Sequence, residues 1–206
     1  GFVLLVPEGT TNSSGLQFWN AMPACCDFEG SGVDDVGYLR GLIEEAQSRY
    51  AIDPDRVYLF GHSNGGFMSF RMACDAADMI TGIASIAGAT YKNESFCEPS
   101  EPVTVLQIHG TLDDTISYDG DVLNPGAADT VEQWAAFNGC VGDPVEGPPT
   151  DFDVAVKGDE TTPLAWADCE EGSGVMLWTM EGSAHIPGFP ETFSPAVLEY
   201  LFAHSH

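Results

Sequence analysis

The chain has 206 residues, of which 44% are hydrophobic and 11% aromatic, so it can bury one core and we expect a single domain spanning residues 1–206. Six Lys and Arg residues against 32 Asp and Glu residues give a formal net charge of −26, which excludes charge-driven binding to nucleic acid and to anionic membranes. No run approaches the roughly 18 consecutive apolar residues that a membrane helix needs, so we expect a soluble protein without a membrane partner.

Strands and helices are predicted to alternate, because short apolar runs bounded by turn residues are followed by apolar residues at helical spacing. The first half of the chain is predicted to form a strand over 2–6, a long ordered loop over 10–32, a helix over 33–50, a strand over 57–60 and a helix over about 65–77. Strands over 82–87 and 103–108 and a helix over 127–137 follow. A Pro, Gly and Asp-rich excursion with a hairpin spans 138–174, before a strand over 175–180 and a helix near 194–204. Each crossover must pack back on the sheet, which favours parallel pairing. We therefore expect an α/β fold with a doubly wound, mostly parallel sheet of about five strands and with its chemistry at the carboxyl ends of the strands.

Six cysteines are spread along the chain without the paired spacing of a zinc site. They are Cys25, Cys26, Cys74, Cys97, Cys140 and Cys169. Their even number predicts disulfides and a location in an oxidising compartment, outside the cell or in a periplasm. We expect the last two to bond and to close the excursion over 138–174, and the two vicinal cysteines to bond with the two in the middle of the chain.

One strand-to-helix junction carries the pattern GxSxG, as Gly61-His62-Ser63-Asn64-Gly65. A nucleophile elbow has small residues beside its serine, because the backbone must turn sharply to expose the hydroxyl. The pattern also arises by chance in a glycine-rich chain, so the alternative is a turn with an incidental serine. Its position between a strand and a helix favours the first interpretation, in which Ser63 is the nucleophile.

A serine hydroxyl needs a base and an acid that orients the base, in the chain order Ser, acid, His for this fold. His185 follows the last predicted strand in a Gly-flanked loop, where the base is expected. His62 lies in the turn itself, and His109 is expected to shape its loop. The remaining histidines, His204 and His206, lie in the terminal tail. We therefore predict His185 as the base.

The motif HGTLDD follows another predicted strand and offers two neighbouring carboxylates. We predict Asp113 as the acid and Asp114 as a cap or brace of the loop. The tetrahedral intermediate of acyl transfer needs two N–H donors. The backbone N–H of Asn64 is predicted as the first, because this residue follows the nucleophile. The sequence does not reveal the second.

These residues resemble the secreted α/β-hydrolases grouped as polyhydroxybutyrate depolymerases and feruloyl or acetyl-xylan esterases. The resemblance rests on motifs spread over nearly the whole chain: VPEGT, FWNA followed by CC, GVDDVGYLRGLI, DPDRVYLFGHSNGG, VLQIHGTLDD and GSAHIPG. It implies a catalytic triad of Ser63, Asp113 and His185. It also implies a secreted, disulfide-rich protein that uses no cofactor and no metal.

The chain differs from that family in two ways. The family's N-terminal stretch, with early strands and a His-Gly oxyanion loop, is not in this sequence, so we expect a reduced α/β-hydrolase fold, in either a fragment or a minimal variant. The late family motif commonly reads GHxWPG, whereas here His185 is followed directly by Ile186. An aromatic side chain that would border the acyl site is therefore missing, and specificity does not carry over.

The sequence thus predicts a serine carboxylic ester hydrolase that forms an acyl-enzyme on short-acyl, feruloyl-type or polyester substrates. Trp19 and Tyr118 lie in loops expected to line the cleft and are candidate substrate walls, with a core position as the alternative for Trp19.

Two alternative functions remain open, and so does the oligomeric state. The same triad would serve an acyltransferase or a peptidase, and a module of this fold could bind a polymer or a partner without catalysis. A sheet edge near residues 2–6 could also be covered by a second copy of the chain, which would make a homodimer.

Overall fold

A mixed six-stranded sheet forms the centre of the protein, and the computed structural model describes residues 1–205 of the chain. The strands lie in the order β3-β4-β5-β8-β7-β6. Their bounds are β3 (Tyr58–His62), β4 (Gly82–Ile86), β5 (Thr104–Gly110), β8 (Val175–Met180), β7 (Thr161–Trp166) and β6 (Val145–Glu146). The first four run parallel, and β7 and β6 add an antiparallel hairpin at one edge. The predicted mostly parallel sheet is confirmed, with six strands instead of about five.

Helices cover both faces of this sheet, because successive side chains of a strand point to opposite sides. The helices are α1 (Asp35–Arg49), α2 (Asn64–Asp75), α3 (Ala127–Phe137) and α4 (Phe193–Phe202). On one face, α2 and α3 pack on Ile83 and Val105, and the rings of Phe70 and Trp134 lie 5.9 Å apart. On the other face, α4 packs on Leu106 and its neighbours. None of the helices in residues 1–205 is long and apolar enough to cross a membrane.

The segment over 2–6 was predicted to be a strand, and this prediction is wrong. Its apolar side chains are exposed, Val6 by 81%, and it pairs with no strand in the part of the chain that the structure describes. A run of apolar residues becomes a strand only where a neighbour accepts its backbone hydrogen bonds. The free parallel edge of the sheet is β3, so the segment over 2–6 does not supply the sheet edge from which the possible homodimer was argued.

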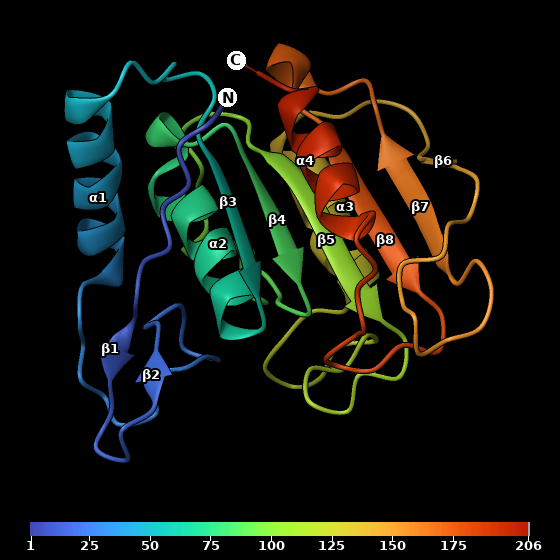
Figure 1. The fold of residues 1–206 in the computed structure, drawn as a ribbon, viewed down its shortest axis with the longest axis horizontal. Coiled ribbons are helices and arrows are strands. Elements are labelled where there is room, and N and C mark those ends of the chain that lie inside the picture. Colours follow the sequence, from blue (N-terminus) through green and yellow to red (C-terminus); the bar gives the residue numbers. More distant parts are fainter. Residues whose placement is uncertain (206) are drawn as a thin grey trace.

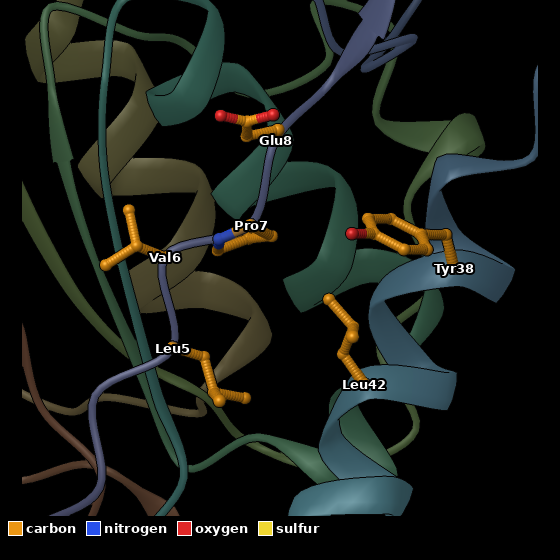
Figure 2. A pocket seen from close by; sticks show the side chains of 6 residues that line it. All are labelled: Leu5, Val6, Pro7, Glu8, Tyr38 and Leu42. Atoms are coloured by element: carbon orange, nitrogen blue, oxygen red, sulfur yellow. The ribbon is translucent and has the colours of Figure 1, made fainter.

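Residues 5–8 run past α1 and leave a hollow of about 310 Å³ between them. Figure 2 shows that Leu5 and Leu42 point into this hollow from its two sides, with Tyr38 beside them. Its lining includes none of Ser63, Asp113 and His185. The expected loop over 10–32 follows, with a short hairpin of β1 (Thr10–Thr11) and β2 (Gln17–Phe18) inside it.

Three disulfides tie the loops to this framework. Cys140 bonds with Cys169 as predicted, beside the hairpin of β6 and β7. The predicted partners of the vicinal cysteines are wrong, because Cys25 and Cys26 bond with each other. Cys74, the next-to-last residue of α2, bonds with Cys97, whose Cα atom lies 4.9 Å away. Such pairing depends on which Cα atoms the fold brings within reach, which spacing along the chain does not reveal.

The loops that follow β3, β5 and β8 gather at one end of the sheet, seen at the lower edge in Figure 1. Parallel strands place their carboxyl ends at the same edge, so loops from distant parts of the sequence meet there. The two chain ends lie near the opposite edge in the same view. The carboxyl edge is therefore where the predicted site residues must come together.

Replacement of Trp134 by Ala tests the packing of α3 on the sheet. The side chain is fully buried and its indole N–H donates to Thr90 Oγ1 at 3.2 Å, so we expect Trp134→Ala to lower the free energy of unfolding by about 3–5 kcal/mol. Val122→Ala, at a side chain that is 89% exposed, is the control and should change it by less than about 0.5 kcal/mol. Urea denaturation of both variants measures the difference, and equal midpoints would contradict the packing described here.

Candidate active site

Ser63 occupies the sharp turn between β3 and α2. Its backbone angles are φ +52° and ψ −117°, a region that residues with a side chain rarely adopt, and its N–H donates to the carbonyl oxygen of Ile86 at 2.7 Å. A Cβ atom on Gly61 would lie 2.3 Å from the backbone of Gly65, so only glycine fits there. The strand-to-helix turn that the GxSxG pattern predicts is therefore present.

A chain of hydrogen bonds joins three loops at this point. Nε2 of His185 lies 2.9 Å from Ser63 Oγ, and Nδ1 lies 2.7 Å from Asp113 Oδ2. An ionised carboxylate can only accept, so Nδ1 carries the proton and Nε2 is free to accept from the serine hydroxyl. Asp113 lies 72 positions before His185 in the sequence, and Ser63 lies 122 positions before it. This arrangement can draw the proton from the serine hydroxyl and store it on an imidazole whose orientation is fixed.

The carboxylate of Asp113 accepts three hydrogen bonds, and a fourth possible donor lies close to it. Oδ1 receives the backbone N–H groups of Thr115 at 2.9 Å and Ile116 at 2.8 Å, while Oδ2 receives His185 and lies 3.2 Å from Nε2 of His109. Burial alone would raise the pKa of Asp113, but these donors outweigh burial and hold it well below the ordinary value. Asp113 is therefore an anion throughout the neutral range.

The other predicted candidates lie as follows. His62 is exposed, and its Nε2 donates to the backbone carbonyl oxygen of His185 at 2.7 Å, so it contacts the loop rather than the serine. Asp114 is exposed beside Thr115, within hydrogen-bond reach of its hydroxyl. His204 contacts the carbonyl oxygen of Tyr200 near the carboxyl end of α4. His206 lies outside the described residues.

Asn64 opens helix α2 directly after Ser63, and the first N–H groups of a helix have no partner within it. Its side chain pairs with both backbone groups of Trp19, accepting from the N–H at 2.7 Å and donating to the carbonyl oxygen at 2.9 Å. The ring of Trp19 is half-buried and stacks on Tyr38, with ring centroids 6.3 Å apart. This pairing ties the loop over 10–32 to the elbow and occupies the N–H of Trp19.

Tyr118 lies behind the acid loop rather than beside the serine hydroxyl. Its hydroxyl group bonds with Thr179 Oγ1 at 2.7 Å, and its ring meets His109 edge-on with centroids 5.7 Å apart. Tyr118 therefore packs against the residues that support Asp113.

Asp153 supports the loop of His185 and was not singled out from the sequence. Its carboxylate accepts from the backbone N–H of Gly188 at 2.9 Å, and Val154 N–H donates back to the carbonyl oxygen of Gly188 at 2.8 Å. The two segments are far apart in sequence, and no local pattern marks the carboxylate. Only the fold reveals that the excursion after α3 braces this loop.

The elbow geometry can be tested by stability alone. We expect Gly61→Ala to lower the free energy of unfolding by about 1–3 kcal/mol or more, because its new methyl group would overlap the backbone of α2. Gly65→Ala is the matched control, since a Cβ atom there meets nothing within 4 Å. Thermal and urea denaturation give the comparison. An equal loss of stability in both variants would show that the close approach at Gly61 does not exist.

Asp113 also makes stability depend on pH. A carboxylate whose pKa is depressed on folding contributes stability that is present above its unfolded value, here an ordinary 3.8, and is lost as the pH falls through the folded value. We therefore expect wild type to exceed Asp113→Asn in unfolding free energy at neutral pH. The difference should shrink only below pH 3.8. A difference that is constant down to about pH 2 would contradict the hydrogen bonds to the ionised group.

Comparisons with known proteins find similar sequences over part or most of the chain. Residues 32–124 match the phospholipase/carboxylesterase family. The chain is 30% identical to feruloyl esterase B of Piromyces equi, with 91% of this chain and 34% of that protein covered. It is 29% identical to putative esterase NocK of Nocardia uniformis subsp. tsuyamanensis, with 87% and 56% covered. The chain thus spans only part of the length of these relatives.

Solved structures show the same fold at low identity. The acetyl xylan esterase from Aspergillus awamori gives a TM-score of 0.57 at 16% identity, with 82% of this chain and 67% of that chain covered. Esterase PE8 gives a TM-score of 0.51 at 16% identity, with 81% and 60% covered. The chain therefore has the fold of these esterases, and its sequence is similar to the phospholipase/carboxylesterase family over residues 32–124 and to feruloyl esterase B over 91% of its own length.

Proposed function

We propose that this protein is a serine carboxylic ester hydrolase that acts through an acyl-enzyme on Ser63. The observation that supports it most is the continuous hydrogen-bonded series from Ser63 Oγ through His185 to Asp113, placed at a strained turn. A serine hydroxyl is otherwise a weak nucleophile near neutral pH. Three relatives that are named feruloyl esterase B, putative esterase NocK and feruloyl esterase D support the same proposal.

In the acylation step, Ser63 Oγ forms a bond with the ester carbonyl carbon while its proton passes to Nε2 of His185. The tetrahedral intermediate then expels the alcohol, which takes that proton from His185. In deacylation a water molecule gives its proton to His185 and attacks the acyl carbonyl carbon. The acid is released, and the proton returns to Ser63 Oγ. Asp113 keeps its charge throughout and stabilises the imidazolium form.

The backbone N–H of Asn64 is our proposal for the first oxyanion donor. It lies at the positive end of α2, one residue after the nucleophile. The Asn64 side chain holds the adjoining loop by its paired hydrogen bonds to Trp19, so the donor sits in a braced segment. The N–H of Trp19 is engaged in that pairing and is not our candidate for the second donor.

The substrates that we propose are neutral esters with short-acyl, feruloyl-type or polyester acyl groups. A net charge of −26 disfavours the approach of anionic substrates. Six relatives are named feruloyl esterases or probable feruloyl esterases and one a bifunctional acetylxylan esterase/xylanase, which favours feruloyl-type and short-acyl esters. We keep Trp19, which is tied to the elbow through Asn64, as a proposed substrate wall. Tyr118 bonds with Thr179 and packs on His109, so we propose that it supports the acid loop instead of contacting the substrate.

An oxidising location is part of the same proposal. All six cysteines are bonded in three disulfides, and such bonds persist outside the cytosol. We therefore propose that the chain works in a secreted, extracellular or periplasmic setting.

Loss of the nucleophile gives the direct test. We expect Ser63→Ala to lower the hydrolysis of p-nitrophenyl acetate by about 10³-fold or more, because no acyl-enzyme can form. Ser69→Ala is the matched control, since that buried hydroxyl bonds only with the Gly65 carbonyl oxygen of its own helix, and it should keep the activity. Undiminished hydrolysis in Ser63→Ala would remove the proposed nucleophile.

Labelling and product analysis separate the alternatives. A fluorophosphonate should label wild type at Ser63 and leave Ser63→Ala unlabelled, and failure to label wild type would favour a module that binds without catalysis. Added alcohol acceptors or peptide substrates test the other alternative. Ester products from the acceptors would indicate an acyltransferase, and cleaved peptides would indicate a peptidase.

A further inference from the structure

His109 is a buried histidine that the proposed reaction does not use. It lies in β5, two residues after Gln107, and only 2% of it is exposed. Its Nε2 lies 2.9 Å from the carbonyl oxygen of Ile116 and 3.2 Å from Asp113 Oδ2. The same carboxylate oxygen receives Nδ1–H of His185. Two histidines therefore meet on one oxygen of the acid.

Gln107 determines which ring nitrogen of His109 carries the proton. Its Nε2 donates to the carbonyl oxygen of Gly88 at 2.8 Å, which identifies this atom as the amide nitrogen. The same Nε2 lies 3.1 Å from Nδ1 of His109, so Nδ1 must accept. The ring proton is therefore on Nε2, where it points toward Asp113 and Ile116. Both atoms that face this proton are acceptors.

We propose that His109 is a positioning residue, which donates from Nε2 to Asp113 Oδ2 and thereby sets the orientation and the effective charge that His185 meets. The inference rests on the proposed function of Ser63 and goes beyond it. His109 itself neither gains nor loses a proton in the reaction. It withdraws part of the negative charge of Oδ2 and holds that oxygen at a fixed place opposite His185.

Nε2–H of His109 is shared between the carbonyl oxygen of Ile116 at 2.9 Å and Asp113 Oδ2 at 3.2 Å, and the second is the charged acceptor. The charged and titratable groups that face it are Asp113 and His185 from the two loops, and the Tyr118 ring that meets it edge-on. Thr115 and Ile116 N–H groups occupy Oδ1, so Oδ2 alone remains for the two histidines. Loss of the His109 donor would leave Oδ2 to His185 alone.

Two substitutions at this position separate positioning from packing. His109→Phe keeps a ring of similar size against Tyr118 but removes the donor, whereas His109→Gln keeps an N–H group near the place of Nε2. We expect His109→Phe to lower kcat for p-nitrophenyl acetate roughly tenfold with little change in KM, as the loss of one hydrogen bond to a charged group implies. His109→Gln should restore most of kcat.

The pH profile supplies a readout that packing alone would not change. Without the competing donor, Oδ2 binds the imidazolium form of His185 more strongly, so the acid limb of kcat/KM in His109→Phe should move to higher pH by about half a unit. Gln107→Leu removes the donor to Nδ1 of His109. This substitution should also move the acid limb of kcat/KM to higher pH, but by less than His109→Phe does. His204→Gln, near the opposite edge of the sheet beside Gly174, is the control and should move nothing.

Proton NMR tests the inference without relying on activity. The Nδ1–H resonance of His185 should shift in His109→Phe and return toward its wild-type position in His109→Gln. The inference would be overturned if folded His109→Phe kept both the wild-type Nδ1–H resonance of His185 and the wild-type acid limb of kcat/KM, even with a lower kcat. Absence of hydrolysis and of fluorophosphonate labelling in wild type would instead refute the proposed function, and the resonance would still report on His109.

Discussion

The positions of Ser63, Asp113 and His185 depend on two places at the carboxyl edge of the sheet where backbone lies directly against backbone. A Cβ atom on Gly61 would lie 2.3 Å from the backbone of Gly65, and one on Gly110 would lie 2.3 Å from the carbonyl oxygen of Ser183. The first contact lets α2 start directly against β3, which forces Ser63 into its turn. The second brings the loop after β8 onto the end of β5. Without these contacts the serine, the imidazole and the carboxylate would not meet.

The same edge of the sheet also shows how a site built from loops is held together. Each loop is tied to another by a backbone group: Leu112 N–H donates to the carbonyl oxygen of Ser183 at 2.9 Å, and Gly188 N–H donates to Asp153. The paired bonds between Asn64 and Trp19 tie a fourth segment to the elbow. A relay of hydrogen bonds needs donor and acceptor positions fixed within a few tenths of an ångström. The framework around Asp113 and His185 supplies that precision through main-chain bonds rather than through packing of flexible side chains.

Sequence reasoning succeeded where a local pattern has a local cause. The strand-to-helix turn at Ser63 was predicted from the neighbouring residues alone, and the helix over 127–137 followed from apolar spacing. It failed where the cause is distant. The residues over 2–6 have strand composition, but no neighbouring strand lies within the described residues to pair with them. The partner of Cys74 and the brace at Asp153 likewise depend on which loops the fold brings together.

The net charge of the protein and the charge of the Asp113 carboxylate act on different steps, because salt screens the first and not the second. The 32 acidic residues give the chain its net charge of −26, but exposed charges are screened by salt over roughly 8–10 Å at physiological ionic strength. Asp113, whose side chain is fully shielded from solvent, acts on His185 at 2.7 Å without such screening. Salt therefore alters how a charged substrate approaches the surface. The interaction between Asp113 and His185 depends instead on the groups that donate to the Asp113 carboxylate. Two of the groups that bond with Asp113 are backbone N–H groups, which a substitution does not remove, and the third is the base itself. His109, 3.2 Å away, is the remaining side chain, and we propose that it tunes the acid.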